Sequence, residues 1–185
     1  MMTVENQETA QANPKLKQEL GIRYGIMLSI VGIILNVAGQ NFPGMGIKFG
    51  IIALGVFSSI LFFVLGIKAF KKQNQGLIKF GDAFAIVAII TVVSSIISGL
   101  FGYLYGTVID PGSIDRQIQE TVSFLENIGA PEAQIDKAIE ELNSKLKDPA
   151  GYLASTLQGV MGGIIGYLII GAIVAAIMKK EEKEV

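Results

Sequence analysis

The stretch AFAIVAIITVVSSIISGLFGYLYGTVI, residues 83–109, decides the fold of this chain, because it holds 27 consecutive residues without a charged side chain. Three further runs without Asp, Glu, Lys or Arg occupy residues 24–47, 49–67 and 149–178. A helix of about 20 apolar residues crosses the hydrocarbon core of a bilayer. A helix of a soluble protein needs one polar face, which uncharged runs of this length do not provide. The four runs therefore predict a polytopic membrane protein.

The overall composition agrees with membrane residence. Hydrophobic residues make up 51% of the 185 positions and charged residues 17%, against about 25% charged in ordinary soluble domains. The formal net charge of −1 argues against a nucleic-acid partner. The sequence has no histidine and no cysteine, so it lacks the usual side chains for zinc or haem ligation, thiol chemistry and histidine acid–base catalysis. We expect no catalytic, cofactor-binding or metal-binding residue, and no enzyme activity.

The apolar runs predict an all-α membrane domain over residues 21–178. The turn Gln40–Gly44 is so short that the first two helices must form an antiparallel pair. We expect residues 1–20 to be a polar tail, disordered up to Asn13-Pro14, and residues 179–185 to be a charged tail. Asn13 is a candidate cap for a helix that enters the membrane as Lys15–Leu20. The expected bounds of the four transmembrane helices are about 22–39, 45–67, 82–109 and 149–178.

The first apolar stretch has one alternative interpretation. It ends at Val37-Ala38-Gly39, whose small residues are typical of a signal-peptidase site. The polar segment before this stretch is long and carries as many acids as bases. We therefore favour a span that is retained in the protein.

Residues 110–148 form the only sizeable polar segment between two spans. Asp110-Pro111 and Asp148-Pro149 are typical of a helix N-cap followed by proline in the first turn. Gly129-Ala130-Pro131 divides the segment into two amphipathic helices, each with one apolar stripe at helical spacing. We expect a helical hairpin outside the membrane, whose stripes bury against each other, the membrane surface or a second copy of the protein. The stripes are Ile114, Ile118, Val122 and Leu125 in the first helix and Ile135, Ile139, Leu142 and Leu146 in the second.

The distribution of basic residues predicts the orientation, because Lys and Arg near span ends are enriched on the cytoplasmic side. Ten basic residues flank the spans on the side of the two termini, and five lie on the side of the hairpin. We expect both termini in the cytoplasm and an extracytoplasmic hairpin. The five residues on the hairpin side are Lys48, Arg116, Lys137, Lys145 and Lys147.

Glycine pairs spaced by four occur in every span, and the fourth span has the densest set. Such pairs let helix backbones approach closely in lipid. Two interpretations are open: a homodimer through the fourth span, or close packing inside one four-helix bundle, which we favour. The glycines of this face are Gly159, Gly162, Gly163 and Gly166.

Two polar features in the third span have both a structural and a functional interpretation. Asp82 opens the span, where an acid caps free amides and complements the helix dipole, with Lys79 as a candidate partner. Its functional alternative is a contact with an ion or a partner on the cytoplasmic side. The hydroxyls of the span either bond back to their own helix, which we favour, or line a polar path. They are Thr91, Ser94, Ser95 and Ser98.

Three short segments occur in a characteristic order before the last span. They are KKQNQG at residues 71–76, FGDAF at residues 80–84 and YGTVIDP at residues 105–111. With the amphipathic insertion that follows, they make the chain similar to a family of small bacterial membrane proteins, domain of unknown function 4199. The resemblance covers roughly residues 20–180. It implies about four spans and residence in the bacterial inner membrane, and it implies no activity.

The spans carry no ionisable residue inside the membrane, although carriers and proton-coupled pumps usually place one there. We therefore expect a structural, accessory or interaction subunit whose external hairpin contacts a partner. The expected partners are the lipid bilayer and either a second copy of the chain or another membrane protein. The alternative function is a small transporter or channel component that uses the serines of the third span.

Overall fold

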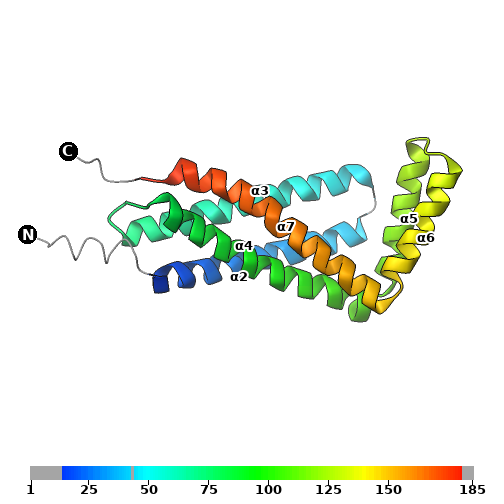
Figure 1. Cartoon of the computed structure of the whole chain (residues 1–185), viewed down its shortest axis with the longest axis horizontal. Helices are drawn as coiled ribbons and strands as arrows, with labels where there is room; N and C mark the ends of the chain where they lie inside the picture. Colours follow the sequence, from blue (N-terminus) through cyan, green and yellow to red (C-terminus); the bar gives the residue numbers. More distant parts are fainter. Residues whose placement is uncertain (1–13, 43, 181–185) are drawn as a thin grey trace, which may run out of the picture.

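The computed structural model describes residues 14–42 and 44–180. Four long helices lie side by side, the described chain begins (Pro14) and ends (Lys180) at one end of this bundle, and a helical hairpin lies at the other (Figure 1). We call these the termini end and the hairpin end. The all-α prediction is confirmed, and all four long helices have the length and composition to cross a membrane. The elements are α2 (Pro14–Asn41), α3 (Met45–Gln73), α4 (Phe80–Leu104), the π-helical turn η1 (Tyr105–Ile109), α5 (Gly112–Asn127), α6 (Glu132–Leu146) and α7 (Pro149–Met178).

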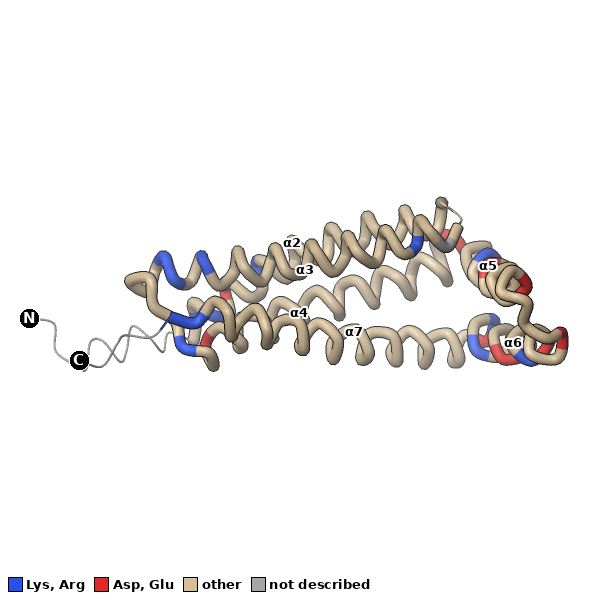
Figure 2. Tube along the Cα trace, turned by 90° about the horizontal axis from the view of Figure 1, so that it is seen from above, with Lys and Arg blue, Asp and Glu red and all other residues tan. Residues whose placement is uncertain are grey.

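The four spans form a closed ring of neighbours. Helix α2 packs against α3 and α4, and α7 packs against the same two helices from the other side. The hairpin helices α5 and α6 run across the end of the bundle rather than along it (Figures 1 and 2). Charged residues gather at the two ends and leave the long middle of the bundle uncharged, as a membrane-spanning protein requires (Figure 2).

The first helix starts at Pro14, where Asn13-Pro14 indicated a start, so the predicted tail of residues 1–20 is too long. Residues 1–13 lie outside the described part of the chain. Residues 15–20 consist of good helix formers. Tertiary contacts add to this preference, since Leu20 is buried in the core and Lys17 donates to the Asp82 carboxylate across a distance of 2.6 Å.

The two expected Asp-Pro caps behave differently. At the start of α7 the prediction is confirmed, since the Asp148 carboxylate accepts from the amide of Gly151 at 2.8 Å and Pro149 occupies the first turn. At the start of α5 the assigned helix begins one residue later, and its N-cap residue Pro111 makes no side-chain capping bond. The main partner of the Asp110 carboxylate is Arg116, one turn into α5, and a hydrogen bond with the backbone of Ser113 makes a smaller contribution. An ionised guanidinium is a stronger partner for a carboxylate than a neutral amide.

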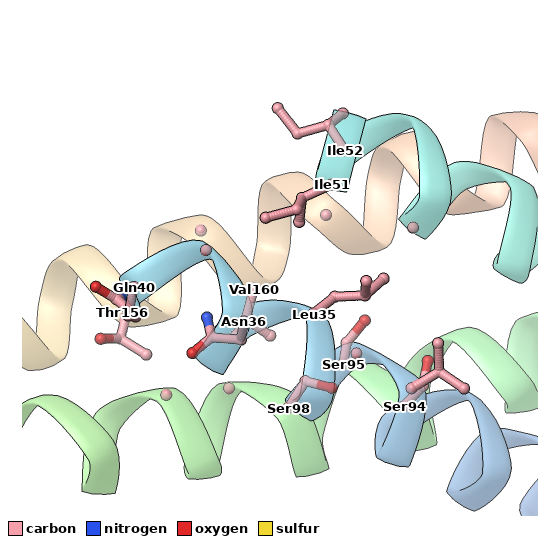
Figure 3. Close-up of a pocket in the computed structure, with 18 of the residues that line it drawn as sticks. Leu35, Asn36, Gln40, Ile51, Ile52, Ser94, Ser95, Ser98, Thr156 and Val160 are labelled. Atoms are coloured by element: carbon pink, nitrogen blue, oxygen red, sulfur yellow. The ribbon is translucent and has the colours of Figure 1, made fainter. Parts of the chain in front are cut away.

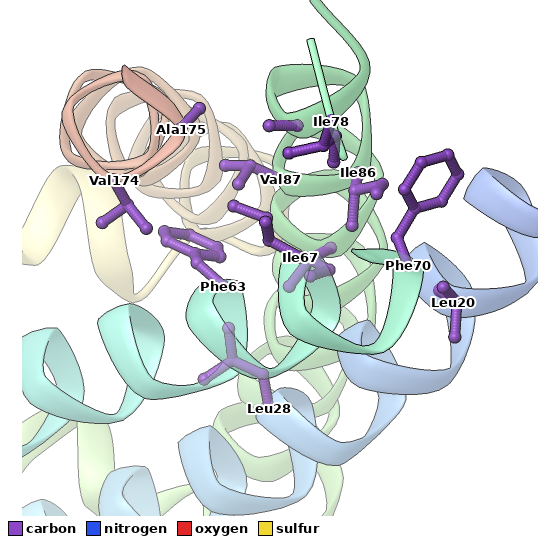
Figure 4. Packing of buried hydrophobic residues seen from close by; sticks show 12 residues of the cluster. Leu20, Leu28, Phe63, Ile67, Phe70, Ile78, Ile86, Val87, Val174 and Ala175 are labelled. Carbon is purple, nitrogen blue, oxygen red and sulfur yellow. The ribbon is translucent and has the colours of Figure 1, made fainter. Parts of the chain in front are cut away.

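The core of the bundle lies in its termini half. Side chains from all four spans meet there, and several of them are completely buried (Figure 4). Two glycines allow the helices to approach this closely. A β-carbon on Gly21 would lie 2.5 Å from Ile89, and one on Gly171 would lie 2.1 Å from Val87. The cluster consists of Leu20, Leu28, Phe63, Ile67, Phe70, Ile78, Ala83, Ile86, Val87, Ile90, Val174 and Ala175.

The connection between α3 and α4 closes the termini end. The backbones of Ile78 and Lys180 exchange two hydrogen bonds of 2.9 Å, which tie the chain after α7 to this loop. The Lys71 ammonium donates to the carbonyl oxygen of Met178 at 3.0 Å and so satisfies one free carbonyl at the end of α7. Gly76 has a φ of 83°, a conformation that favours glycine. The KKQNQG segment therefore has a structural role: it connects α3 to α4 and binds the end of α7.

Candidate functional site

A cavity of about 680 Å³ lies between the four spans in the hairpin half of the bundle (Figure 3). This volume falls within the range of roughly 300–1,000 Å³ that is typical of small-molecule sites. Each span contributes to the wall: for example Leu35 from α2, Ile51 from α3, Ser98 from α4 and Val160 from α7. We call this space the bundle cavity.

The wall of the bundle cavity combines apolar side chains with neutral polar ones. Hydroxyl and amide groups line it at several depths, and Lys48 is the one charged residue among the lining residues. Ser94 donates back to the carbonyl oxygen of Thr91 at 3.1 Å, as we expected of hydroxyls in a membrane helix. Its neighbours Ser95 and Ser98 also line the cavity. The polar lining comprises Asn36, Gln40, Lys48, Ser58, Ser94, Ser95, Ser98, Gln117, Tyr152, Ser155, Thr156 and Tyr167.

The bundle cavity is closed toward the termini end. Its innermost lining residues include Leu28, Ser94 and Tyr167. Directly beyond them lie Phe63 and Ile90, both completely buried in the core. A ligand in the cavity therefore meets a packed floor and not a path through the protein.

A slot between α3 and α7 opens the bundle cavity sideways. Ile52 of α3 and Gly159 of α7 both line the cavity and are also exposed on the outer surface of the bundle. Closer to the termini end the two helices meet, where the Tyr167 hydroxyl lies near Gly55. Because both edges of the slot belong to spans, it faces the lipid.

The hairpin covers the cavity from outside the membrane. Lys48 forms an ion pair with Glu120 of α5, and the Gln117 amide donates to the Gln40 side chain at 3.4 Å. Tyr152, near the start of α7, donates to the carbonyl oxygen of Gly102 at 3.3 Å. These contacts fix the hairpin against α2, α3 and the two spans that carry it.

The two hairpin helices also hold each other. They pack together, and Lys147 pairs with Asp115 at 3.0 Å. Ile118 is buried and the other seven stripe residues are half-buried, which favours the expectation that the stripes face each other. The turn between them follows the Schellman pattern: Gly129 has a φ of 73°, and the amide of Ala130 donates to the carbonyl oxygen of Leu125 at 3.0 Å.

A second cavity of about 750 Å³ lies between the α2–α3 turn and α5. Most of its lining residues are of polar types, and three of them carry a charge: Lys48, Arg116 and Glu120. Arg116 donates to the Asp110 carboxylate, and this hydrogen bond is the main reason that the pKa of Asp110 falls below its ordinary value. We call this space the surface cavity.

The glycine face of α7 does not pack within the chain. A β-carbon on Gly159, Gly162, Gly163 or Gly166 would meet no other atom within 4 Å. Our preference for packing of these four glycines inside one bundle is therefore wrong, because α7 turns this face toward the slot and the surface. Gly21 and Gly25 of α2 do pack closely, on Ile89 and Val93 of α4. The homodimer stays a prediction.

Asp82 lies in the first turn of α4 and pairs with Lys17 of α2. The proposed partner Lys79 is instead the N-cap residue, and no side-chain capping bond forms there. Both charged side chains are largely shielded, with exposed fractions of 17% for Asp82 and 18% for Lys17. The pair joins two spans at the termini end, far from both cavities. Asp82 therefore joins α2 to α4 in the described bundle, and its contact with an ion or a partner stays a prediction.

The comparison with protein families agrees with this architecture. The model of the family described as Protein of unknown function (DUF4199) matches residues 19–180. The chain belongs to this family. Neither the curated proteins nor the solved structures yielded a match. Membership of DUF4199 therefore names no function and no ligand, and the membrane-spanning character rests on the four apolar helices of the chain.

Sequence reasoning missed the residues that join the hairpin to the bundle. Lys48 is the one charged residue between Tyr24 and Ile67. This isolation was a sequence signal that Lys48 has a specific partner. Its partner Glu120, 72 positions later, looks like any solvated acid of an amphipathic helix. Within residues 14–42 and 44–180, no group of three acidic side chains is placed to hold a metal ion.

Proposed function

We propose that this DUF4199 protein is an accessory membrane protein that binds an amphiphilic small molecule in its bundle cavity. The observation that carries the proposal is the contrast between an open, hydroxyl-lined hairpin half and a completely packed termini half. A site with apolar walls and a few neutral polar groups suits a ligand that is itself mostly apolar.

The proposal includes an orientation and the absence of catalysis. Both termini lie in the cytoplasm and the hairpin lies outside, which is supported by the ten-to-five excess of basic residues at the termini end. The membrane is the bacterial inner membrane, as the family resemblance implies. The lack of histidine and cysteine supports a binding role over an enzymatic one.

A cysteine introduced into the cavity tests the proposal, since the chain has no cysteine of its own. In Ser98→Cys, the thiol lies in the cavity wall, and an uncharged monoacylglycerol should slow its reaction with N-ethylmaleimide. The control is Ile96→Cys on the same helix, because Ile96 is 58% exposed outside the cavity lining. Its reaction should not depend on the amphiphile. Equal reaction of both thiols with and without amphiphile would refute the binding function.

The alternative function is a small transporter or channel component, and the serines along the cavity wall favour it. Transport would require the termini half to open, where Phe63, Ile67, Ile86 and Ile90 are completely buried. Reconstituted vesicles decide between the two functions. Binding without flux of small ions or sugars supports an accessory role, and protein-dependent flux supports transport.

A further inference from the structure

The bundle cavity and the surface cavity adjoin each other at the hairpin end. Gln40 of α2 and Lys48 of α3 line both of them. The two spaces differ in the charged residues of their walls: Lys48 is the one charged residue that lines the first, whereas Lys48, Arg116 and Glu120 line the second. A ligand that occupies both spaces must therefore have an apolar part and a charged part.

The hydrogen-bond donors of the surface cavity can serve an anionic group. Lys48 and Arg116 contribute two positive charges, which the carboxylates of Glu120 and Asp110 balance. Both cations already have a carboxylate partner, Glu120 and Asp110 respectively. An ammonium has three donor hydrogens and a guanidinium has five, so each can serve a second acceptor. A phosphate, which accepts several charge-assisted hydrogen bonds, matches this donor set.

The slot supplies a route for the apolar part. It opens between Ile52 and Gly159, which belong to two different spans, so a chain can enter from the membrane without crossing the polar surface. Gly163, which also lines the cavity, has no atom within 4 Å of its β-carbon position. The inner wall therefore leaves room for an acyl chain.

We propose that the chain binds a phospholipid of the hairpin-side leaflet. One acyl chain occupies the bundle cavity, and the phosphate lies in the surface cavity at Lys48 and Arg116. This inference rests on the proposed function, because it names the amphiphile that the bundle cavity takes. It adds a requirement that the proposed function lacks: recognition of the head group.

The experiment compares two probes with the same acyl chains, phosphatidylglycerol and diacylglycerol, in the Ser98→Cys protein. Each is titrated in detergent at constant detergent concentration, and protection of the thiol from N-ethylmaleimide gives an apparent affinity. Phosphatidylglycerol should protect at lower concentration. Lys48→Ala combined with Arg116→Ala should weaken protection by phosphatidylglycerol by at least about tenfold, because the phosphate loses its charge-assisted hydrogen bonds. Protection by diacylglycerol should fall much less, because diacylglycerol has no phosphate to lose these bonds.

Two control variants separate charge from hairpin attachment. Glu120→Gln breaks the ion pair with Lys48 but keeps the cation, so protection by phosphatidylglycerol should be retained or strengthened. Lys137→Ala removes an exposed cation of α6 outside both cavity linings and should have no effect. Inorganic phosphate should not protect the thiol, since it lacks the apolar chain.

The outcomes distinguish the two proposals. Equal protection by both probes, unchanged when Lys48 and Arg116 are replaced, would refute head-group recognition and leave amphiphile binding intact. A loss of phosphatidylglycerol protection in Glu120→Gln as large as in the double variant would also refute it, because attachment of the hairpin would then be the cause. No protection by either probe would refute the proposed function itself.

Discussion

The same four helices build a tightly packed termini half and a hollow hairpin half. In lipid, apolar side chains gain nothing simply by leaving the solvent, so helix association depends on shape and on hydrogen bonds. At the termini end, Gly21 and Gly171 bring helix axes close enough for completely buried side chains such as Phe63. At the hairpin end, glycines such as Gly163 face open space and the wall carries hydroxyls. The difference shows that glycine content alone does not indicate packing; what matters is whether a large side chain faces the glycine.

Replacement of a packed glycine should have the largest effect on stability. In Gly171→Leu, the new β-carbon would lie 2.1 Å from Val87, and overpacking of this kind costs about 1–3 kcal/mol or more. Thermal unfolding in detergent should show a large loss. The matched control is Gly50→Leu in α3, whose β-carbon position has no atom within 4 Å. An equal loss in both variants would remove the distinction between the two halves.

The ion pair at the termini end should have the next largest effect. Lys17 and Asp82 are mostly shielded from solvent, and a hydrogen bond between charged groups contributes about 1.5–3 kcal/mol. Lys17→Met should therefore destabilise the bundle, and a double-mutant cycle with Asp82→Asn should show strong coupling. The exposed pair Lys145–Glu141 gives the comparison, since surface pairs contribute about 0–1 kcal/mol. A coupling of zero for Lys17 and Asp82 would show that the pair does not join α2 to α4.

Much of the fold could be predicted from the sequence, because in a membrane the absence of charge marks each span. The four helices, the hairpin and its glycine turn follow from local patterns. The Asn13-Pro14 signal indicated the start of α2 correctly, but the contact of Lys17 with Asp82 of α4 could not be predicted, because the two residues lie far apart in the chain. The π-helical turn at Tyr105–Ile109 was also missed. There Gly106 lies against the Tyr152 ring from α7, a contact between residues far apart in the chain.

The candidate site was less predictable than the fold. The serines of the third span were recognised as a polar feature, but a cavity depends on which side chains face each other across four helices. Ser98 and Thr156 both line the cavity, although they lie 58 positions apart in the chain. A local sequence pattern cannot indicate that two such distant residues lie in one wall. The preference for close packing of the α7 glycines failed for the same reason.

A single substitution in the contacts between the hairpin and the bundle should have a moderate effect on how firmly the hairpin is held. Lys48→Ala removes the ion pair with Glu120, whose side chain is 25% exposed, so the cost should be at most about 1 kcal/mol. The expected result is faster proteolytic cleavage near Gly129 with little change in the unfolding of the bundle. Lys137→Ala is the control. Unchanged cleavage would mean that the remaining contacts hold the hairpin alone.

Acidification should also loosen the attachment of the hairpin. The hydrogen bond from Arg116 lowers the pKa of Asp110 in the folded protein below its ordinary value of 3.8. A carboxyl whose pKa is lowered by folding stabilises the folded protein when the pH is above its ordinary pKa. This stabilisation is lost as the pH falls from the ordinary pKa through the lowered one. Cleavage near Gly129 should therefore stay constant down to about pH 5 and rise below about pH 3.8, as followed with an acid-active protease. In Arg116→Met, cleavage near Gly129 should already be fast at neutral pH. If the variant and the native protein have the same pH profile, the Asp110–Arg116 pair does not restrain the hairpin.

The uncovered glycine face should give the smallest effect of all. Gly162 is exposed, and a β-carbon there would meet no atom within 4 Å, so Gly162→Leu should change the unfolding temperature of the monomer very little. Surface changes away from packed features usually alter stability by less than about 0.5 kcal/mol. The informative measurement is the mass of the protein–detergent complex by light scattering. If the native chain is a dimer and Gly162→Leu is a monomer of unchanged stability, the face is covered by a second copy. If both are monomers, the face contacts lipid, and the slot beside it is free to admit an acyl chain.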